Sequence, residues 1–162
     1  MLLYLLRHGI AIPGDRPGGP PDGDRPLTAD GALRTRKAAR GLRRLGVAPG
    51  RVLSSPFRRA VETARIAMQV LGTPRARCRT TVTLLPDRPA DAVLALVRRS
   101  NARNVLCVGH APNLDLVLAA AIGSEAPVTA LRKAGAAAIE IVRGRGRLVW
   151  LLEPKALRRL GA

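Results

Sequence analysis

Two short apolar runs, each followed by a histidine beside a glycine, constrain most strongly how this chain folds. Leu2 to Leu6 precedes Arg7-His8-Gly9, and Asn104 to Val108 precedes Gly109-His110. Runs of this kind are typical of buried parallel strands, and the glycines let the chain turn sharply after them. Ligands of open α/β sheets bind beyond the carboxyl ends of the strands, so we expect both histidines of the chain at one crevice.

Helical and extended segments alternate along most of the chain. We expect helices over residues 29–45, 56–71, 89–99 and 112–122, with Thr28 and Ser55 as N-terminal caps and Pro56 at a first helical position. Strands are expected over residues 2–6, 51–54, 80–85, 104–108, 136–142 and 147–152, with a turn over residues 143–146 and a short helix after Pro154. This order predicts an α/β fold: a three-layer sandwich with a mainly parallel central sheet, helices on both faces and an antiparallel C-terminal hairpin at one edge.

The length and composition predict a small protein without metals or cofactors. The chain has 162 residues, and we expect a single domain over residues 1–162. The segment from Ile10 to Pro26 is crowded with Gly, Pro and Asp and is expected to form an exposed loop bordering the crevice. Cys78 and Cys107 lack metal-ligand spacing, and the opening apolar stretch is too short for a signal peptide. We therefore predict a cytoplasmic protein with no metal, no cofactor and no membrane partner.

The charge of the chain is strongly positive. The formal net charge is +17, and the basic residues are scattered from Arg7 to Arg159. Such a charge attracts anionic partners, or it reflects arginines spread over solvated faces, and the scatter favours the second interpretation. The aromatic residues are Tyr4, Phe57 and Trp150 alone, so stacking of bases is disfavoured and no specific nucleic acid partner is predicted. A non-enzymatic module that binds polyanions stays an alternative.

The segment from Ser55 to Thr63 supplies a third side of the expected crevice. A helix N-terminus offers free N–H groups and a positive dipole end, which attract an anion. Arg58 and Arg59 lie in this first turn, about 100° apart around the helix. One of them can face the crevice while the other faces solvent or Glu62, and the spacing does not decide which. Arginine forks suit phosphate oxygens, so arginines beside histidines indicate phosphoryl chemistry.

Four ordered motifs resemble the histidine phosphatase superfamily. They are Arg7-His8-Gly9, Leu27-Thr28 with Gly31, Ser55-Pro56 with Arg59-Ala60 and Thr63, and Gly109-His110. The small size of the chain and the element Arg25-Pro26-Leu27-Thr28 are most similar to the SixA-type phosphohistidine phosphatases of that superfamily. The resemblance spans nearly the whole chain, and four motifs in order are far more specific than any one of them.

The resemblance implies roles for four residues. His8 would be the nucleophile that becomes phosphorylated, and Arg7, Arg59 and His110 would bind the phosphoryl oxygens. Arg59 is preferred over Arg58 because the arginine of the family precedes an alanine. His8 must be neutral to attack, with one ring nitrogen free toward phosphorus and the other donating to an orienting acceptor. The nearby arginines disfavour the imidazolium form.

The proton donor is left open. Residues 82–91 contain no glutamate of the kind that the phosphoglycerate mutase branch carries there, although Asp87 lies nearby. By analogy with the family, Asp22 or Asp24 is a candidate acid, and the alternative is that both are solvated loop carboxylates. Imidazole, whose conjugate acid has a pKa of about 6.5, leaves more readily than an alkoxide, so a weak or absent acid fits a phosphoramidate substrate.

The expected activity is removal of phosphate from phosphohistidine on a protein, as in signal transduction. The alternative within the same superfamily is a phosphatase that acts on a small phosphomonoester. In either case the partner is a phosphorylated molecule, and phosphate or sulfate is expected to bind in the pocket.

Overall fold

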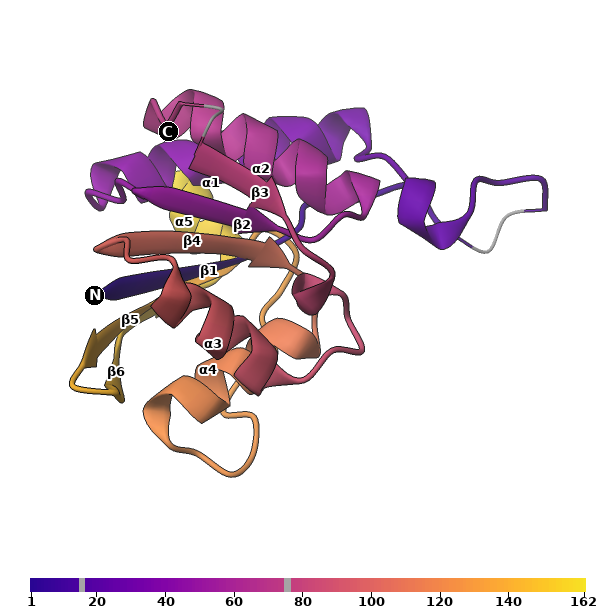
Figure 1. Ribbon diagram of the computed structural model, residues 1–162. Coiled ribbons are helices and arrows are strands. Elements are labelled where there is room, and N and C mark those ends of the chain that lie inside the picture. Colours follow the sequence, from indigo (N-terminus) through magenta and orange to yellow (C-terminus); the bar gives the residue numbers. More distant parts are fainter. Residues whose placement is uncertain (15–16, 75–76) are drawn as a thin grey trace.

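A six-stranded mixed sheet forms the centre of the molecule (Figure 1). The computed structural model describes residues 1–14, 17–74 and 77–162. The strands are β1 (Leu2–Arg7), β2 (Arg51–Ser54), β3 (Cys78–Thr80), β4 (Asn104–Gly109), β5 (Ala136–Val142) and β6 (Arg145–Leu152). Their order is β3-β2-β4-β1-β5-β6; the first four run parallel, and β5 and β6 form an antiparallel edge. The predicted α/β fold, with a mainly parallel sheet and a hairpin edge, is confirmed.

Helices cover both faces of the sheet (Figure 1). Helices α1 (Ala29–Arg44), α2 (Arg58–Leu71) and α5 (Pro154–Leu160) pack on one face, and α3 (Ala90–Arg99) and α4 (Asn113–Ile122) on the other. Successive side chains of a strand point to opposite faces. In β1, Tyr4 and Leu6 therefore join the core under α1, α2 and α5, while Leu3 and Leu5 join the core under α3 and α4. Burial on both sides explains why this strand is apolar throughout.

Helix α1 begins and ends close to the predicted positions. The Thr28 hydroxyl accepts a hydrogen bond of 2.9 Å from Gly31 N, as a cap residue does. After the last helical residue, Arg44, the chain reaches Gly46 with a φ of 76°, a left-handed conformation that glycine adopts without strain. The tail helix expected after Pro154 is also present as α5.

The predicted start of the second helix is wrong. Helix α2 begins at Arg58, and Phe57 is its N-terminal cap residue. Ser55 is therefore not the cap, and Pro56 is not the first helical residue. The Ser55 side chain is completely buried, and its hydroxyl shares a hydrogen bond of 2.8 Å with His110 Nε2. The same hydroxyl accepts a hydrogen bond of 3.3 Å from Phe57 N, so it closes a turn ahead of the helix and does not cap the first helical turn.

The strand predicted over residues 80–85 is largely wrong. Strand β3 ends at Thr80, and a 3-10 helix, η3 (Val82–Leu84), follows it. Strand β2 ends at Ser54, where Thr81 N makes a last hydrogen bond to the Ser54 carbonyl, so no partner backbone remains for a longer strand. The Thr81 hydroxyl then accepts from Thr83 N and starts the 3-10 turn.

Two loops also differ in detail from the predictions. The hairpin turn is shorter than expected, with β6 starting at Arg145 and only Arg143 and Gly144 between the strands, both at positive φ. The loop expected over residues 10–26 contains a 3-10 helix, η1 (Asp22–Asp24), and its residues 15 and 16 lie outside the described part of the chain. In the described residues, no helix is both long and apolar enough to pass through a bilayer.

The contact between α1 and α5 predicts an unusual response to alanine. Alanine normally stabilises a helix over glycine by about 1 kcal/mol, but a Cβ at Gly41 would collide with the Leu157 carbonyl of α5. We expect Gly41→Ala to lower the free energy of unfolding by about 1–3 kcal/mol in urea denaturation. A matched change at Gly50, where a Cβ meets no atom closer than 3.6 Å, should be nearly neutral. A stabilised Gly41→Ala protein would contradict this close packing.

Candidate active site

The carboxyl ends of β1 and β4 bring the two histidines together. The strands pair in parallel with Arg7 opposite Gly109, and His8 N donates to the Gly109 carbonyl at 2.9 Å. His8 and His110 follow these positions, so their rings lie 4.9 Å apart between centroids, tilted by 55°. Both side chains are buried. The structure thus joins two residues that are distant in the sequence at one edge of the sheet.

The His8 ring is held in one orientation and one tautomer. Its Nδ1 lies 2.7 Å from the Gly9 carbonyl oxygen, which can only accept, so Nδ1 carries the proton and Nε2 keeps its lone pair. Burial lowers the pKa of His8 to about 3; the Gly9 hydrogen bond opposes this shift, and the charges of His110, Arg59 and Arg7 add to it. The imidazole is therefore neutral at neutral pH, with a free nucleophilic nitrogen.

His110 is also neutral and is oriented by residues next to α2. Its Nε2 shares the hydrogen bond with Ser55 Oγ, and the Phe57 ring meets it edge-on at 5.2 Å between centroids. Burial and the charge of Arg59 lower the pKa of His110 to about 4. Its Nδ1 is buried and has no hydrogen-bond partner among the described residues.

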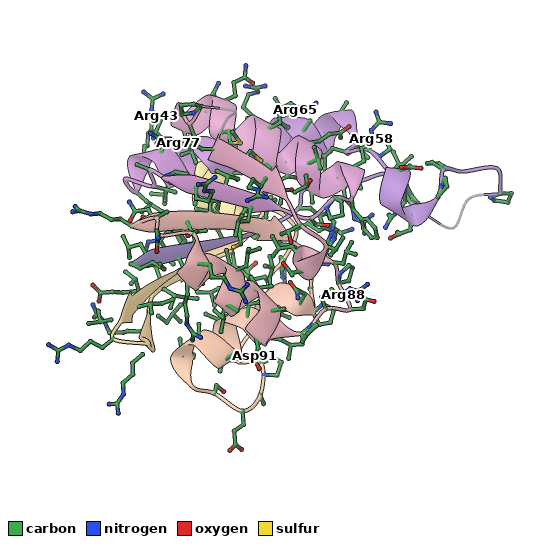
Figure 2. The ribbon with its side chains drawn as sticks, in the orientation of Figure 1. Arg43, Arg58, Arg65, Arg77, Arg88 and Asp91 are labelled. Carbon is green, nitrogen blue, oxygen red and sulfur yellow. The ribbon has the colours of Figure 1, made fainter. Side chains whose placement is uncertain are left out.

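From the first turn of α2, the charge of Arg59, and not that of Arg58, acts on both histidines. Its side chain is buried, with Nη1 donating to the Asp22 carbonyl at 2.6 Å and Nη2 to the Asp22 carboxylate at 3.2 Å. The guanidinium also lies 4.8 Å from the centre of the Phe57 ring. Arg58 lies on the outside (Figure 2) and pairs with Glu62 at 2.8 Å. The structure decides the choice that spacing left open.

Arg7 is the second cation beside His8. It is the last residue of β1, and its Nη1 donates to the Leu131 carbonyl at 2.6 Å. The Leu131 N–H in turn donates to the Asp115 carboxylate at 2.8 Å. Burial lowers the pKa of Arg7 and the charge of Asp115 opposes this, but an arginine stays charged at neutral pH. The loop at residue 131 therefore fixes the guanidinium beside the histidines.

The three acidic residues considered as proton donors differ in their contacts with this cluster. Asp22 contacts Arg59 and Arg25 directly; burial raises its pKa, but the hydrogen bonds and charges of these arginines outweigh that effect and lower it. Asp24 is exposed and makes no side-chain hydrogen bond within the described residues. Asp87 is 76% exposed, with Arg88 at 3.8 Å as its partner. Only Asp22 among them contacts a buried side chain of the cluster.

Sequence reasoning named Ser55 and Thr63 as motif residues, but it missed the contacts by which they and Phe57 support the cluster. Ser55 and Phe57 position His110, and Thr63 links two segments, since its hydroxyl accepts from Gly9 N at 3.0 Å and donates to the Arg59 carbonyl at 2.7 Å. Gly9 itself must lack a side chain, because a Cβ would collide with the Thr35 hydroxyl. A small polar residue directly after a strand, such as Ser55, could have indicated a side chain that supports the cluster. The roles of Phe57 and Thr63 depend on tertiary contacts.

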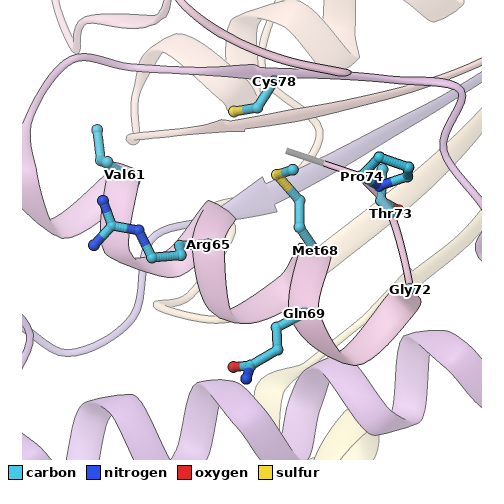
Figure 3. Close-up of a pocket in the computed structure, with 8 residues that line it drawn as sticks. All are labelled: Val61, Arg65, Met68, Gln69, Gly72, Thr73, Pro74 and Cys78. Atoms are coloured by element: carbon cyan, nitrogen blue, oxygen red, sulfur yellow. The ribbon is translucent and has the colours of Figure 1, made fainter. Parts of the chain in front are cut away.

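A separate cavity of about 600 Å³ lies between α2 and β3 (Figure 3). Its lining includes Arg65, Met68, Gln69 and Cys78 but neither histidine. Burial raises the pKa of the Cys78 thiol despite the opposing charge of Arg65, and burial raises that of Cys107 to about 12, so both thiols stay protonated. Among the described residues, no group of three or more His, Cys, Asp and Glu could hold a metal ion.

Known proteins are similar to this chain in sequence and in fold. The model of the histidine phosphatase superfamily (branch 1) matches residues 3–81. An uncharacterized protein of a Picosynechococcus strain is 37% identical over 139 residues, 83% of this chain and 82% of that protein. The chain belongs to the histidine phosphatase superfamily. Phosphohistidine phosphatase SixA of Escherichia coli K12 is 27% identical, over 98% of this chain and 97% of its own. A solved structure of the protein histidine phosphatase SixA with tungstate has a TM-score of 0.85 at 26% identity, covering 97% of this chain and 99% of that one.

The two low histidine pKa values predict acid sensitivity. Both histidines have a pKa near 6.5 when unfolded and about 3 or 4 when folded, so between these values the unfolded chain binds more protons. Stability is complete above pH 6.5 and is lost as the pH falls toward 4. We expect each histidine to lower the free energy of unfolding by about 1–2 kcal/mol at pH 5 relative to pH 7, as measured by urea unfolding. The loss of stability between pH 7 and pH 5 should be smaller in His8→Gln than in wild type. Equal losses in the two proteins would show that His8 is not buried in its neutral form.

Proposed function

We propose that this histidine phosphatase superfamily protein removes phosphate from phosphohistidine on another protein, through a phosphorylated His8. The observation that carries the proposal is the His8 imidazole: it is buried and neutral, with Nδ1 bound to Gly9 and Nε2 free, beside a second imidazole. A neutral imidazole with a free lone pair is a nucleophile, and fixed cations beside it stabilise a phosphoryl group in transit. The similarity to SixA supports phosphohistidine as the substrate.

In the first step, His8 Nε2 attacks the phosphorus of the substrate. The Nε2–P bond forms as the bond between phosphorus and the substrate nitrogen breaks, and the departing imidazole takes up a proton. Negative charge on the three phosphoryl oxygens is held by Arg7, Arg59 and His110, in a site with little water to screen it. The Gly9 carbonyl stabilises the positive charge that develops on the His8 ring, because it accepts the Nδ1 proton.

In the second step, water attacks the phosphorus of phospho-His8. The Nε2–P bond breaks, the electron pair returns to Nε2, and one proton of the water passes to a phosphoryl oxygen, so that dihydrogen phosphate forms. Because both rings have pKa values well below 7, His8 returns to its neutral form once phosphate leaves. No metal or cofactor is needed to balance either step.

Asp22 gives Arg59 an oxyanion partner before substrate binds. The carbonyl and carboxylate of Asp22 hold both Nη groups of Arg59, in the way that two phosphate oxygens would. A substrate phosphate competes for this guanidinium. Arg25 keeps its two hydrogen bonds to the Asp22 carboxylate when Arg59 is released, so this carboxylate stays beside the phosphate site. Asp22 is the stronger of the two donor candidates because it contacts Arg59, whereas the exposed Asp24 contacts no residue of the cluster among the described residues.

Phosphate transfer to His8 tests the proposal directly. We expect brief incubation with radiolabelled phosphoramidate to leave an acid-labile phosphate on the wild type and none on His8→Gln. We also expect hydrolysis of a phosphohistidine protein to be much faster than hydrolysis of alkyl phosphates, whose leaving groups need a proton. Full labelling of His8→Gln would refute the nucleophile, and a preference for alkyl phosphates would favour the small-molecule alternative.

Neighbouring arginines provide a matched test of the phosphate site. We expect Arg59→Gln to lower kcat/KM by about 10²–10³, since removing one fixed donor to a developing charge has effects of this size. Arg58→Gln removes the same charge one residue away, from an exposed pair with Glu62, and should stay within about threefold of wild type. Equal losses in the two variants would mean that net charge, and not the position of Arg59, governs the rate.

A further inference from the structure

The charges of this protein are segregated along the direction of the strands. Acidic residues gather where the strands end, in the first turns of helices (Asp30, Asp91, Asp115) and in η1 (Asp22, Asp24). The opposite side, where the strands begin, is rich in arginine. Figure 2 shows Arg43 and Arg77 on the side where the strands begin, and Arg58 and Arg88 on the side where they end.

A row of arginines follows the edge where the strands begin. Arg77 directly precedes β3, Arg51 is the first residue of β2, Arg103 directly precedes β4, and Arg143 and Arg145 flank Gly144 in the β5–β6 turn. The strand order places these five residues, here called the strand-start row, in sequence across the sheet. Neighbouring strands lie about 4.8 Å apart, so the row extends over roughly 24 Å. The histidine crevice lies at the other end of the strands.

The strand-start row is available to a partner. Arg51 is half-buried and the other four arginines are exposed, and none of the five forms an ion pair with any described residue. By contrast, Arg25, Arg58 and Arg59, near the crevice, are paired with carboxylates. The molecule therefore neutralises many of its cations at the catalytic end and few at this edge.

Helix electrostatics explain part of the segregation but not the row. Cations stabilise the negative C-terminal end of a helix, and Arg43, Arg44, Arg98, Arg99, Arg158 and Arg159 all lie in last turns. The strand-start row lies outside these last turns, at strand starts and in a hairpin turn, and the effect of a helix dipole falls off beyond the last turn. Like charges along one edge repel each other. The row thus has no evident role in stabilising the fold.

We propose that the strand-start row binds the phosphate backbone of a nucleic acid duplex without sequence preference. A duplex presents one negative charge per about 1.7 Å, so a row of roughly 24 Å faces many phosphates, and arginine suits phosphate oxygens. A lipid surface would also require bulky apolar groups. Among the described neighbours of the row in sequence, Val142 is the one large apolar side chain that is exposed. The scarcity of aromatic residues fits backbone contacts and excludes stacking on bases.

Such binding leaves the catalytic crevice free. The row and the two histidines lie at opposite ends of the strands, so a duplex at one end does not cover the other. In this proposal the positive charge of the row binds a nucleic acid duplex, and this binding is independent of the phosphatase reaction. The proposal does not require the proposed function to be correct.

Salt-dependent binding to a labelled duplex tests the row. We expect wild type to bind a random duplex of about 20 base pairs in fluorescence anisotropy, with log K falling linearly with log salt. The triple variant Arg77→Gln, Arg103→Gln, Arg145→Gln should bind at least about tenfold more weakly near 0.1 M salt, with a slope shallower by about 2.7. The single variant Arg103→Gln should change the slope by about 0.9.

A matched control separates the row from net charge. The triple Arg88→Gln, Arg132→Gln, Lys133→Gln removes the same charge from exposed positions near the crevice and should keep the affinity within about threefold. Equal losses in the two triples, or no binding by wild type at 0.1 M salt, would overturn the proposal. Stronger binding to anionic vesicles than to the duplex, lost in the row triple, would overturn it in favour of a membrane. Both triples should retain hydrolysis of a small phosphoramidate, so a failed phosphatase assay and a failed binding assay are distinguishable.

Discussion

The parallel pairing of β1 with β4 is the interaction on which the rest of the site depends. A shift of this register by one residue would turn every side chain of the strand to the other face, which the two cores forbid because Leu3, Leu5, Tyr4 and Leu6 are all buried. The register places Arg7 opposite Gly109. Hydrophobic burial on both faces thus fixes the distance between two imidazoles that take no part in the core.

Burial has a second consequence at the ends of these strands. Desolvation is the largest cause of the low pKa of both histidines, and the arginines beside them act in the same direction. The same enclosure makes charged donors effective toward a phosphoryl group, since little water screens them. A single physical condition, the exclusion of water beside fixed cations, therefore keeps the imidazoles neutral and favours an anion, and the proposed reaction requires both.

The directions of the elements also organise the surface charge. In the parallel part of the sheet, helices run back against the strands, so their N-termini meet at the catalytic end and their C-termini at the other. Acidic first turns and basic last turns complement the helix dipoles in this arrangement. The fold itself separates acids from bases, and the strand-start row adds cations beyond what the dipoles require.

Local sequence determined the elements, the layers and the motifs of this protein. The apolar run of β1, the Thr28 cap and the glycine-containing hairpin are specified by neighbouring residues, and periodicity is a local property. The predictions failed where a distant partner outweighed local preference: Ser55 bonds to His110 and does not cap α2, and β3 stops where β2 has no more backbone to offer. Spacing left Arg58 and Arg59 open, and only the family resemblance preferred Arg59. The tertiary structure alone decided that Asp22 holds the Arg59 guanidinium and that Gly9 fixes the His8 tautomer. These contacts depend on distances between segments that approach each other only when the sheet is assembled.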